Sequence, residues 1–513
     1  MSIASTTTKS SEIRDRLSHP VIDGDGHWME PTETLVHYIE KVGGTWAADA
    51  YLKFHEQVNG WYKVPPADRM RARAMRIPWW GGPAGTLDKA TSILPDLMYR
   101  RLDEFGIDFC LISASRFGPG VQNPDPKLRH AFARAANLMN AELFADYSDR
   151  ITASAVLPME TPEEAIEELE FAVKELGMKY VLIASVRRPI AAHADENADT
   201  WGGVPYYIDT FGMDSPYDYD PLWEKFVELK VAPCTHSGAL GWVDRSSPTN
   251  FTYNHIGHFA HAAHAVAKSI YMGGVTRRFP TLRWGFLECG AGWARNLQTD
   301  LAGHWAKRNR ETMLEHYAPT VTDLDELGRL IDRHGGELLS GRSETVTSQP
   351  DATFPGVGAE ELVERELETL DDFEAVDVHS KREVMAEFAR NFHFGCEADD
   401  PMTMMAFDRR FGAPLKALFG SDISHFDVID MTEVLEEAYE MVEHGWIDES
   451  QFRSFTFENV VSLHGGMNPD FFKGTVVEQA VAEELARQQA AADGAAPSTA
   501  TAPGRTGAEG EAQ

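Results

Sequence analysis

Short apolar runs alternate with amphipathic stretches along most of the chain. Between the runs, residues 161–178, 220–230 and 431–445 place apolar side chains at helical spacing, and Thr161 is a suitable helix N-cap. Eight strands alternating with helices favour a parallel (β/α)8 TIM barrel, although strand counting alone also allows an open doubly wound sheet. The runs that we predict to be buried strands are residues 21–28, 108–115, 151–159, 180–185, 232–237, 282–289, 391–397 and 417–424.

The domain organisation follows from where this alternation begins, ends and is interrupted. We expect one barrel domain over residues 19–478, with insertions at about 29–107 and 303–390 that form a lid or cap over a site or make subunit contacts. Residues 1–18 are polar and expected to be flexible. Residues 479–513 should begin as a helical extension and continue as a disordered tail rich in Ala, Gly and Pro.

Charge and composition narrow the class of protein. The 513 residues include 47 basic and 80 acidic side chains, so the net charge of −33 disfavours nucleic-acid and membrane-surface partners. The N-terminus lacks the apolar core of a secretion signal, and no stretch approaches the roughly 20 apolar residues of a membrane span. We therefore expect a cytoplasmic protein in which four cysteines are small buried side chains: Cys110, Cys234, Cys289 and Cys396.

The first apolar run contains Asp23, Asp25 and His27 at alternate positions, in the sequence VIDGDGHW. On a strand these side chains share one face, and burying two carboxylates and an imidazole there is costly unless their charge is compensated. A divalent cation would provide that compensation. The alternative is that the two aspartates accept hydrogen bonds from backbone amides around Gly24 and Gly26.

Other strand ends bear the same kinds of side chain. His236 ends the fifth predicted strand, Glu288 ends the sixth, and Asp422 ends the eighth, with His425 three residues later. Because the carboxyl ends of barrel strands converge, these groups are expected to meet at one site. Convergence of several such groups favours a metal site over a set of independent structural contacts.

Four stretches resemble, in this order, the amidohydrolase-related branch of the amidohydrolase superfamily. That branch includes aminocarboxymuconate-semialdehyde decarboxylase and the resorcylate-type decarboxylases, and the resemblance extends from about residue 20 to 475. It implies a metal-dependent TIM barrel. The stretches are VIDGDGHWMEP, PLWEKFVELKVAPCTHSG, GGVTRRFPTLRWGFLECGAGW and FGSDISHFD.

The resemblance also implies a ligand set. Carried over by position, the metal ligands are Asp25, His27, His236 and Asp422. Asp23 matches the leading aspartate of the family's motif and supports either the turn or the ligands from behind. Asp25 stands where the family often has a histidine. A carboxylate there makes the site harder and more anionic, which favours Mn²⁺ or Fe²⁺ without excluding Zn²⁺.

Glu288 occupies a position where the decarboxylases have a histidine. It is a candidate general acid/base, or a ligand of a second metal ion together with His425 or a residue of the histidine-rich stretch. The competing interpretation is a structural glutamate paired with Arg283 or Arg295.

The histidine-rich stretch at residues 254–269 cannot serve one ion as a whole. Its histidines recur every three residues, so on one helix His255 and His264 face opposite sides. Only His255 and His258 are placed to act as second-metal or substrate-binding residues. Arg116, directly after the second strand, is a candidate for binding a substrate carboxylate, or an ordinary loop arginine.

We therefore predict a metal-dependent enzyme that hydrolyses or non-oxidatively decarboxylates a small organic acid or carbonyl compound. Its catalytic residues are Glu288, Asp422 and His425. In hydrolysis, a carboxylate takes a proton from the attacking water. In decarboxylation, an acid protonates the carbon that loses CO₂.

Two other functions remain open at this stage. One is a dinuclear iron oxygenase (hydroxylase) that uses O₂ and works with a related partner subunit, as some proteins at the fringe of the family do. The other is a non-catalytic scaffold subunit, against which the complete ligand set argues. The oxygenase would draw its additional ligands from Asp25, Glu288, His425, His255 and His258.

The expected cofactor is a divalent metal ion: Zn, Mn or Fe. The expected partners are a small-molecule substrate and, in the assembly, a second identical subunit or a related one. The residues that select the substrate are expected in the two insertions.

Overall fold

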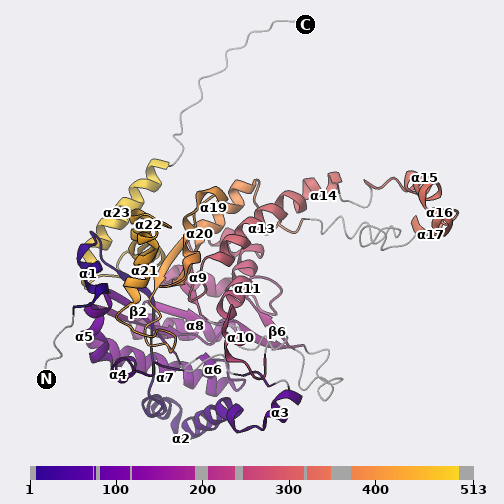
Figure 1. Ribbon diagram of the computed structural model, residues 1–513. Coiled ribbons are helices and arrows are strands. Elements are labelled where there is room, and N and C mark those ends of the chain that lie inside the picture. Colours follow the sequence, from indigo (N-terminus) through magenta and orange to yellow (C-terminus); the bar gives the residue numbers. More distant parts are fainter. Residues whose placement is uncertain are drawn as a thin grey trace.

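A computed structural model describes residues 7–72, 74–76, 81–115, 118–190, 206–236, 247–316, 321–347 and 371–495. Eight parallel strands form a barrel around which the helices are arranged (Figure 1). Each strand lies within, or overlaps, one of the eight predicted runs. In spatial order they are β1 (Ile22–Trp28), β2 (Phe109–Ala114), β3 (Ile151–Val156), β4 (Tyr180–Ile183), β7 (Pro233–Thr235), β8 (Trp284–Phe286), β9 (Phe392–Glu397) and β10 (Lys416–Gly420).

The barrel closes between its first and last strands. The Asp422 amide donates to the Asp25 carbonyl (3.0 Å), and the His27 amide donates to the Ile423 carbonyl (3.0 Å). Both bonds come from the segment just after β10, so closure brings the two ends of the strand order together at the carboxyl edge. The structure confirms the predicted (β/α)8 architecture.

The outer helices bury one apolar face each against the barrel. Thr161 caps α8 by accepting a hydrogen bond from the Glu164 amide, as its sequence suggested. The larger outer helices are α5 (Pro95–Phe105), α7 (Pro126–Phe144), α8 (Pro162–Glu170), α9 (Asp220–Leu229), α11 (His258–Met272), α13 (Gly292–Arg308), α19 (Lys381–Asn391), α21 (Val434–Glu443) and α23 (Glu478–Ala495).

Shorter helical segments connect these elements. They are α6 (Gly118–Val121), η2 (Ala145–Tyr147), η3 (Phe171–Glu175), α10 (Phe251–His255), α12 (Val275–Arg278), η7 (Pro401–Thr403), α20 (Met404–Phe407), η8 (Arg409–Phe411), α22 (Glu449–Arg453), η9 (Ser454–Glu458) and η10 (Val461–Gly465).

The described parts of the two predicted insertions are largely helical. Residues 29–107 contain α2 (Thr32–Val58), η1 (Asn59–Lys63), α3 (Pro66–Arg71) and α4 (Thr86–Ile93) before the outer helix α5. Residues 303–390 contain α14 (Arg310–His316), α15 (Leu324–His334), α16 (Gly336–Leu339) and α17 (Ser343–Thr347). We call residues 321–347 the arm, which stands off from the barrel in Figure 1.

Three features differ from the sequence prediction or add to it. Residues 9–16, expected to be flexible, form α1 (Lys9–Arg16), because Thr8 and Ser11 make a capping box and Ile13 is buried. The antiparallel pair β5 (Val186–Pro189) and β6 (Tyr206–Asp209) was not predicted. Helix α23 covers the start of the predicted extension, and the rest of that tail lies outside the described residues.

The four cysteines are buried and free of disulfides, as predicted. Among the described residues, no helix is both long enough and apolar enough to cross a membrane.

Candidate metal centre

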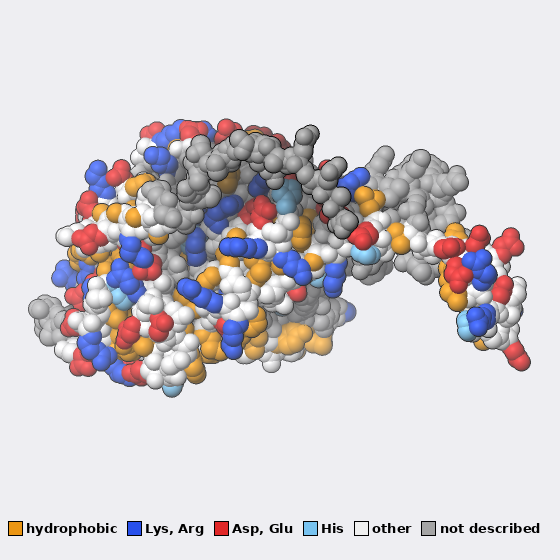
Figure 2. Space-filling view, turned by 90° about the horizontal axis from the view of Figure 1, so that it is seen from above, with side chains coloured by type: hydrophobic (Ala, Val, Ile, Leu, Met, Phe, Trp, Pro, Cys, Tyr) orange, Lys and Arg blue, Asp and Glu red, His pale blue; other side chains and the backbone are white. Residues whose placement is uncertain are grey.

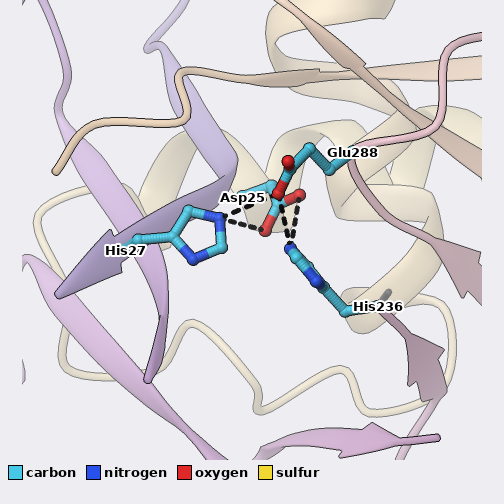
Figure 3. A group of neighbouring side chains, drawn as sticks. All are labelled: Asp25, His27, His236 and Glu288. Atoms are coloured by element: carbon cyan, nitrogen blue, oxygen red, sulfur yellow. Dashed lines mark ion pairs between the residues drawn. The ribbon is translucent and has the colours of Figure 1, made fainter. Parts of the chain in front are cut away.

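The barrel brings six metal-competent side chains together at its carboxyl edge. Asp25 and His27 project from β1, His236 follows β7, and Glu288 follows β8. Figure 3 shows these four side chains pointing toward one another from three parts of the barrel. Asp422 and His425, in the loop after β10, complete the cluster.

The first group consists of Asp25, His27, His236 and Glu288. One donor atom from each lies within 4.8 Å of the others. His236 Nε2 is 2.9 Å from Glu288 Oε2, and His27 Nε2 is 3.5 Å from Asp25 Oδ1. Both distances are short enough for the four donors to surround a single ion.

The second group consists of His27, Glu288, Asp422 and His425, with the same spread of donor atoms. His425 Nδ1 lies 2.5 Å from Asp422 Oδ1, and His27 Nε2 lies 3.0 Å from that oxygen. The two groups therefore share His27 and Glu288. The predicted ligand set placed Asp422 with Asp25, His27 and His236, whereas the structure puts Glu288 in that group and Asp422 beside His425.

The donor atoms themselves provide the test of whether a metal ion fits. Burying a polar atom without a hydrogen bond is costly, and several such atoms pointing to one place indicate a missing ligand. A divalent cation satisfies carboxylate oxygens and imidazole nitrogens together, so these residues fit one. Within the described residues, the buried donor atoms that lack a hydrogen-bond partner include Asp25 Oδ1, His27 Nε2, His236 Nε2, Glu288 Oε2 and Asp422 Oδ1.

The protonation energetics of the cluster agree with that fit. Burial is the largest cause that raises the pKa of Asp25, Glu288 and Asp422 well above the ordinary carboxyl range. Burial also lowers the pKa of His27 and His236, so both imidazoles are neutral near pH 7. A bound cation favours ionised carboxylates and neutral imidazoles. It would therefore offset the electrostatic repulsion among the three buried carboxylates.

Asp23 lies outside both donor groups. Its Oδ1 accepts from the amides of Asp25 (3.1 Å) and Ser421 (2.9 Å), and its Oδ2 accepts from the Ser421 hydroxyl (2.5 Å) and the Cys110 thiol (3.0 Å). The carboxylate thus joins β1 to the segment directly before Asp422. The interpretation of a backbone-bonded aspartate is correct for Asp23, whereas Asp25 Oδ1 has no such partner.

The backbone at two donor residues is left-handed. Glu288 has φ 50° and Asp422 has φ 52°, and Ser424 beyond them has φ 80°. For residues other than glycine, this conformation costs on the order of 1–3 kcal/mol each, and it persists only where the surroundings enforce it. Hydrogen bonds do so here, since the Cys289 amide donates to the Gly395 carbonyl and the Asp422 amide to that of Asp25.

The remaining sequence candidates lie at the rim or elsewhere. His255 Nε2 is 3.3 Å from Asp427 Oδ2, and the break at Gly257 (φ 71°) separates α10 from the helix that bears His258. His258 Nε2 is buried without a hydrogen-bond partner among the described residues, and burial lowers its pKa to about 4. Neither histidine belongs to a donor group. Arg116 lies outside the described residues.

The competing interpretation of Glu288 as an arginine-paired structural residue is wrong. Arg283 donates to the carbonyl and hydroxyl oxygens of Ser462, and Arg295 donates to main-chain carbonyls such as that of Met405. Both arginines therefore stabilise other segments, and Glu288 faces His236 instead.

Two acidic residues near the centre were missed by sequence reasoning. Asp427 pairs with His255, and Glu397 ends β9. Part of the Glu397 side chain is exposed to solvent. Desolvation of its carboxylate by the surrounding protein, together with repulsion from Glu288 and Asp427, raises its pKa to about 8. The signal for Glu397 was available, since a carboxylate at a strand end was the criterion that selected Glu288.

Comparison with known proteins identifies a family and several relatives of this chain. A model of the amidohydrolase family matches residues 22–442. The gamma-resorcylate decarboxylase of Polaromonas sp. (strain JS666 / ATCC BAA-500) is 33% identical over 139 residues, which are 27% of this chain and 37% of that protein. The gamma-resorcylate decarboxylase of Rhizobium sp. (strain MTP-10005) is 27% identical over 185 residues, covering 32% of this chain and 56% of that protein.

The chain thus spans 37% to 56% of the length of these two curated relatives. Among solved structures, a dihydroxybenzoic acid decarboxylase from Polaromonas sp. JS666 with bound manganese and 2-nitroresorcinol aligns with a TM-score of 0.47. It has 17% identity, with coverage of 87% of this chain and 97% of that chain.

Proposed function

The chain belongs to the amidohydrolase family, and we propose that it is a metal-dependent carboxy-lyase or hydrolase acting on a small organic acid or carbonyl compound. The observation that carries the proposal is the convergence of buried, hydrogen-bond-deficient donor atoms from β1, β7, β8 and β10. Decarboxylation is favoured over hydrolysis because the two curated relatives compared above are decarboxylases.

In this proposal Asp25, His27, His236 and Glu288 would hold the ion. A bound divalent ion supplies Lewis-acid polarisation of substrate oxygens and lowers the pKa of water. The residues around it would bind the substrate in a water-poor site and donate or accept the protons of the reaction.

The proton chemistry belongs to the pair of Asp422 and His425. Their side chains are 2.5 Å apart, and the other ring nitrogen of His425 lies 3.4 Å from the Ser115 hydroxyl. In decarboxylation, this pair would donate a proton to the carbon whose bond to CO₂ breaks. In hydrolysis, Asp422 or Glu288 would take a proton from the water that attacks the carbonyl carbon.

One observation supports a second candidate function. The two donor groups share His27 and Glu288, so six side chains offer ligands for two adjacent ions. With iron, this arrangement suits an O₂-dependent oxygenase, for which a related partner subunit would be expected. His255 and His258 lie outside both groups, so neither is needed for the second set.

The test is metal content per chain, measured by elemental mass spectrometry on protein purified without oxygen and without added metal. Wild type is compared with Asp25→Ala, and Asp427→Asn is the matched control at the rim. About one equivalent of Zn or Mn that is lost in Asp25→Ala alone supports the carboxy-lyase or hydrolase. Near two equivalents of Fe supports the oxygenase.

Activity then separates the functions. A carboxy-lyase releases CO₂ from its acid without O₂, and Asp422→Ala abolishes that release while leaving the protein folded. If wild type binds no metal after incubation with Zn, Mn and Fe, the proposal is refuted.

A further inference from the structure

The arm carries an apolar surface that it cannot bury by itself. None of the side chains of α15 or α16 is buried, and Leu324, Leu330 and Leu338 are 42%, 44% and 77% exposed. Within the described elements, α15 packs mainly against α16 and α17. A unit of this size is well below the roughly 40 residues that can sustain a core alone, so, among the described residues, the apolar side chains of the arm stay exposed unless another surface covers them.

Figure 2 shows the arm apart from the body, with hydrophobic and acidic side chains exposed next to each other. Residues 321–347 contain six acidic and three basic side chains. Glu326 pairs with Arg329, and Asp332 accepts hydrogen bonds from Ser343 and Gly341. By contrast, Asp325 and Glu337 make no ion pair with any described residue.

A surface with the opposite character lies at residues 60–76, which we call the η1–α3 face. Its described residues include four basic side chains and one acidic side chain, in a chain whose net charge is −33. It also exposes Tyr62 (58%), Val64 (37%) and Met70 (49%). The η1–α3 face thus exposes apolar side chains next to basic ones, whereas the arm exposes apolar side chains next to acidic ones.

Two arginines of this face have no acidic partner among the described residues. The guanidinium groups of Arg69 and Arg76 lie 3.7 Å and 5.3 Å from the centre of the Trp61 ring. Arg69 donates from Nη2 to the Tyr62 carbonyl (3.1 Å) and Arg76 donates from Nη1 to the Thr249 carbonyl (3.2 Å), both in exposed hydrogen bonds, whereas Arg71 pairs with Asp68. Stacking on Trp61 fixes the two guanidinium groups, and their exposed Nη atoms, which donate to neutral carbonyls, can also donate to carboxylates.

We propose that the arm of one chain docks on the η1–α3 face of a second copy of this chain. The complement is twofold: exposed leucines meet Tyr62 and Met70, and carboxylates such as Asp325 and Glu337 meet Arg69 and Arg76. A second copy is favoured over the same chain because the two surfaces are far apart in Figure 1, with the arm clear of the barrel.

The docking surface adjoins the segment that bears His255, near the metal centre. The Arg76 amide donates to the Ser247 carbonyl (3.0 Å), and the Asn254 side chain donates to the Arg76 carbonyl (2.8 Å). Asn254 precedes His255, which lies at the rim. The arm of the second copy therefore lies close to the segment in which His255 pairs with Asp427.

The experiment uses two single-cysteine additions, because the four native cysteines are buried. Full-length Tyr62→Cys protein and Leu330→Cys protein are mixed, allowed to exchange subunits, and treated with a bis-maleimide. We expect a product of two chains, each of 57.1 kDa, only in the mixture. Val476→Cys, an exposed position elsewhere (57%), replaces Tyr62→Cys in the matched control and gives at least tenfold less product.

Charge reversal provides the second measurement. Arg69→Glu with Arg76→Glu should reduce the two-chain product at least tenfold, and Asp325→Arg with Glu337→Arg in the other chain should restore it. A cross-link that forms only within a Tyr62→Cys/Leu330→Cys single chain would show that the arm folds back, and would overturn the proposal. So would the absence of any cross-link when circular dichroism shows that the variants are folded.

Discussion

Replacing Asp23 tests whether this residue supports the metal centre or takes part in it. The side chain is fully buried and accepts hydrogen bonds from two backbone amides, one hydroxyl and one thiol. In Asp23→Ala, the amides of Asp25 and Ser421 remain buried without an acceptor, at about 1–3 kcal/mol each. Loss of a desolvated carboxylate offsets part of this cost, so the free energy of unfolding should fall by about 3 kcal/mol.

Asp23→Asn should be milder. Its amide oxygen can accept from the same two backbone amides, and its amino group can donate to Ser421, so the expected cost is about 1 kcal/mol. In both variants the segment that positions Asp422 is loosened. Since outer-shell partners typically contribute tenfold to a hundredfold in metal affinity, we expect weaker metal binding with unchanged stoichiometry.

Asp25→Ala should have the opposite effect on stability, and it is therefore compared with Asp23→Ala. Asp25 is a buried carboxylate whose Oδ1 lacks a hydrogen-bond partner among the described residues, and Glu288 repels it. In metal-free protein its removal should leave the unfolding free energy unchanged or raise it, while metal binding is lost.

The assay is urea unfolding of chelator-treated protein, followed by tryptophan fluorescence, together with a metal titration of each variant. The reasoning is refuted if Asp23→Ala lies within about 0.5 kcal/mol of wild type, which is half of the lowest cost expected for one unsatisfied amide. It is equally refuted if Asp25→Ala is the more destabilised of the two in the absence of metal.

Three further predictions concern stability. Thr161→Ala removes the N-cap of α8 and should cost about 1 kcal/mol in urea unfolding, whereas Thr161→Ser should cost much less. Gly274→Ala should cost about 2–4 kcal/mol, because φ is 71° and a Cβ would lie 2.0 Å from the Ala375 carbonyl oxygen; a soluble variant of wild-type stability would contradict this contact. His464 is buried and its pKa is lowered to about 3, so its stabilising contribution is present above pH 6.5 and is lost as pH falls. Between pH 6.5 and 5 wild type should lose about 2 kcal/mol at this residue, and His464→Phe, which can keep the ring stacking with Phe471, should show a flatter stability profile; equal slopes would exclude His464 as the cause.

Much of the barrel was predictable because its strands are buried on both faces. A strand of that kind is a largely apolar run, and each of the eight strands lies within or overlaps one, although β1 also contains Asp23, Asp25 and His27. The pair β5 and β6 lacked this signal, since Val186–Pro189 contains two arginines and alternates between buried and exposed residues. Helix α1 was missed because a short polar segment becomes ordered only through its cap and the burial of Ile13.

The sequence predicted which residues belong to the candidate site better than it predicted which of them lie close enough to share one ion. Asp25, His27, His236 and Asp422 were selected because strand ends of a barrel converge, and the structure brings all four together with Glu288 and His425. Sequence reasoning did not find the pairing of His255 with Asp427, because that contact joins the end of α10 to the loop after β10, and only the fold brings the two together.

The sequence by itself determined which residue types stand at the strand ends, because period-two alternation and apolar runs are local properties. Only the tertiary structure decided that Glu288 shares a donor group with His236, and that Asp422 lies beside His425. Those distances depend on closure of the barrel between β1 and β10 and on left-handed backbone at Glu288 and Asp422. Such conformations are unfavourable in isolated chains and are held by hydrogen bonds between segments almost 400 residues apart, such as Ser421 to Asp23, which no local pattern records.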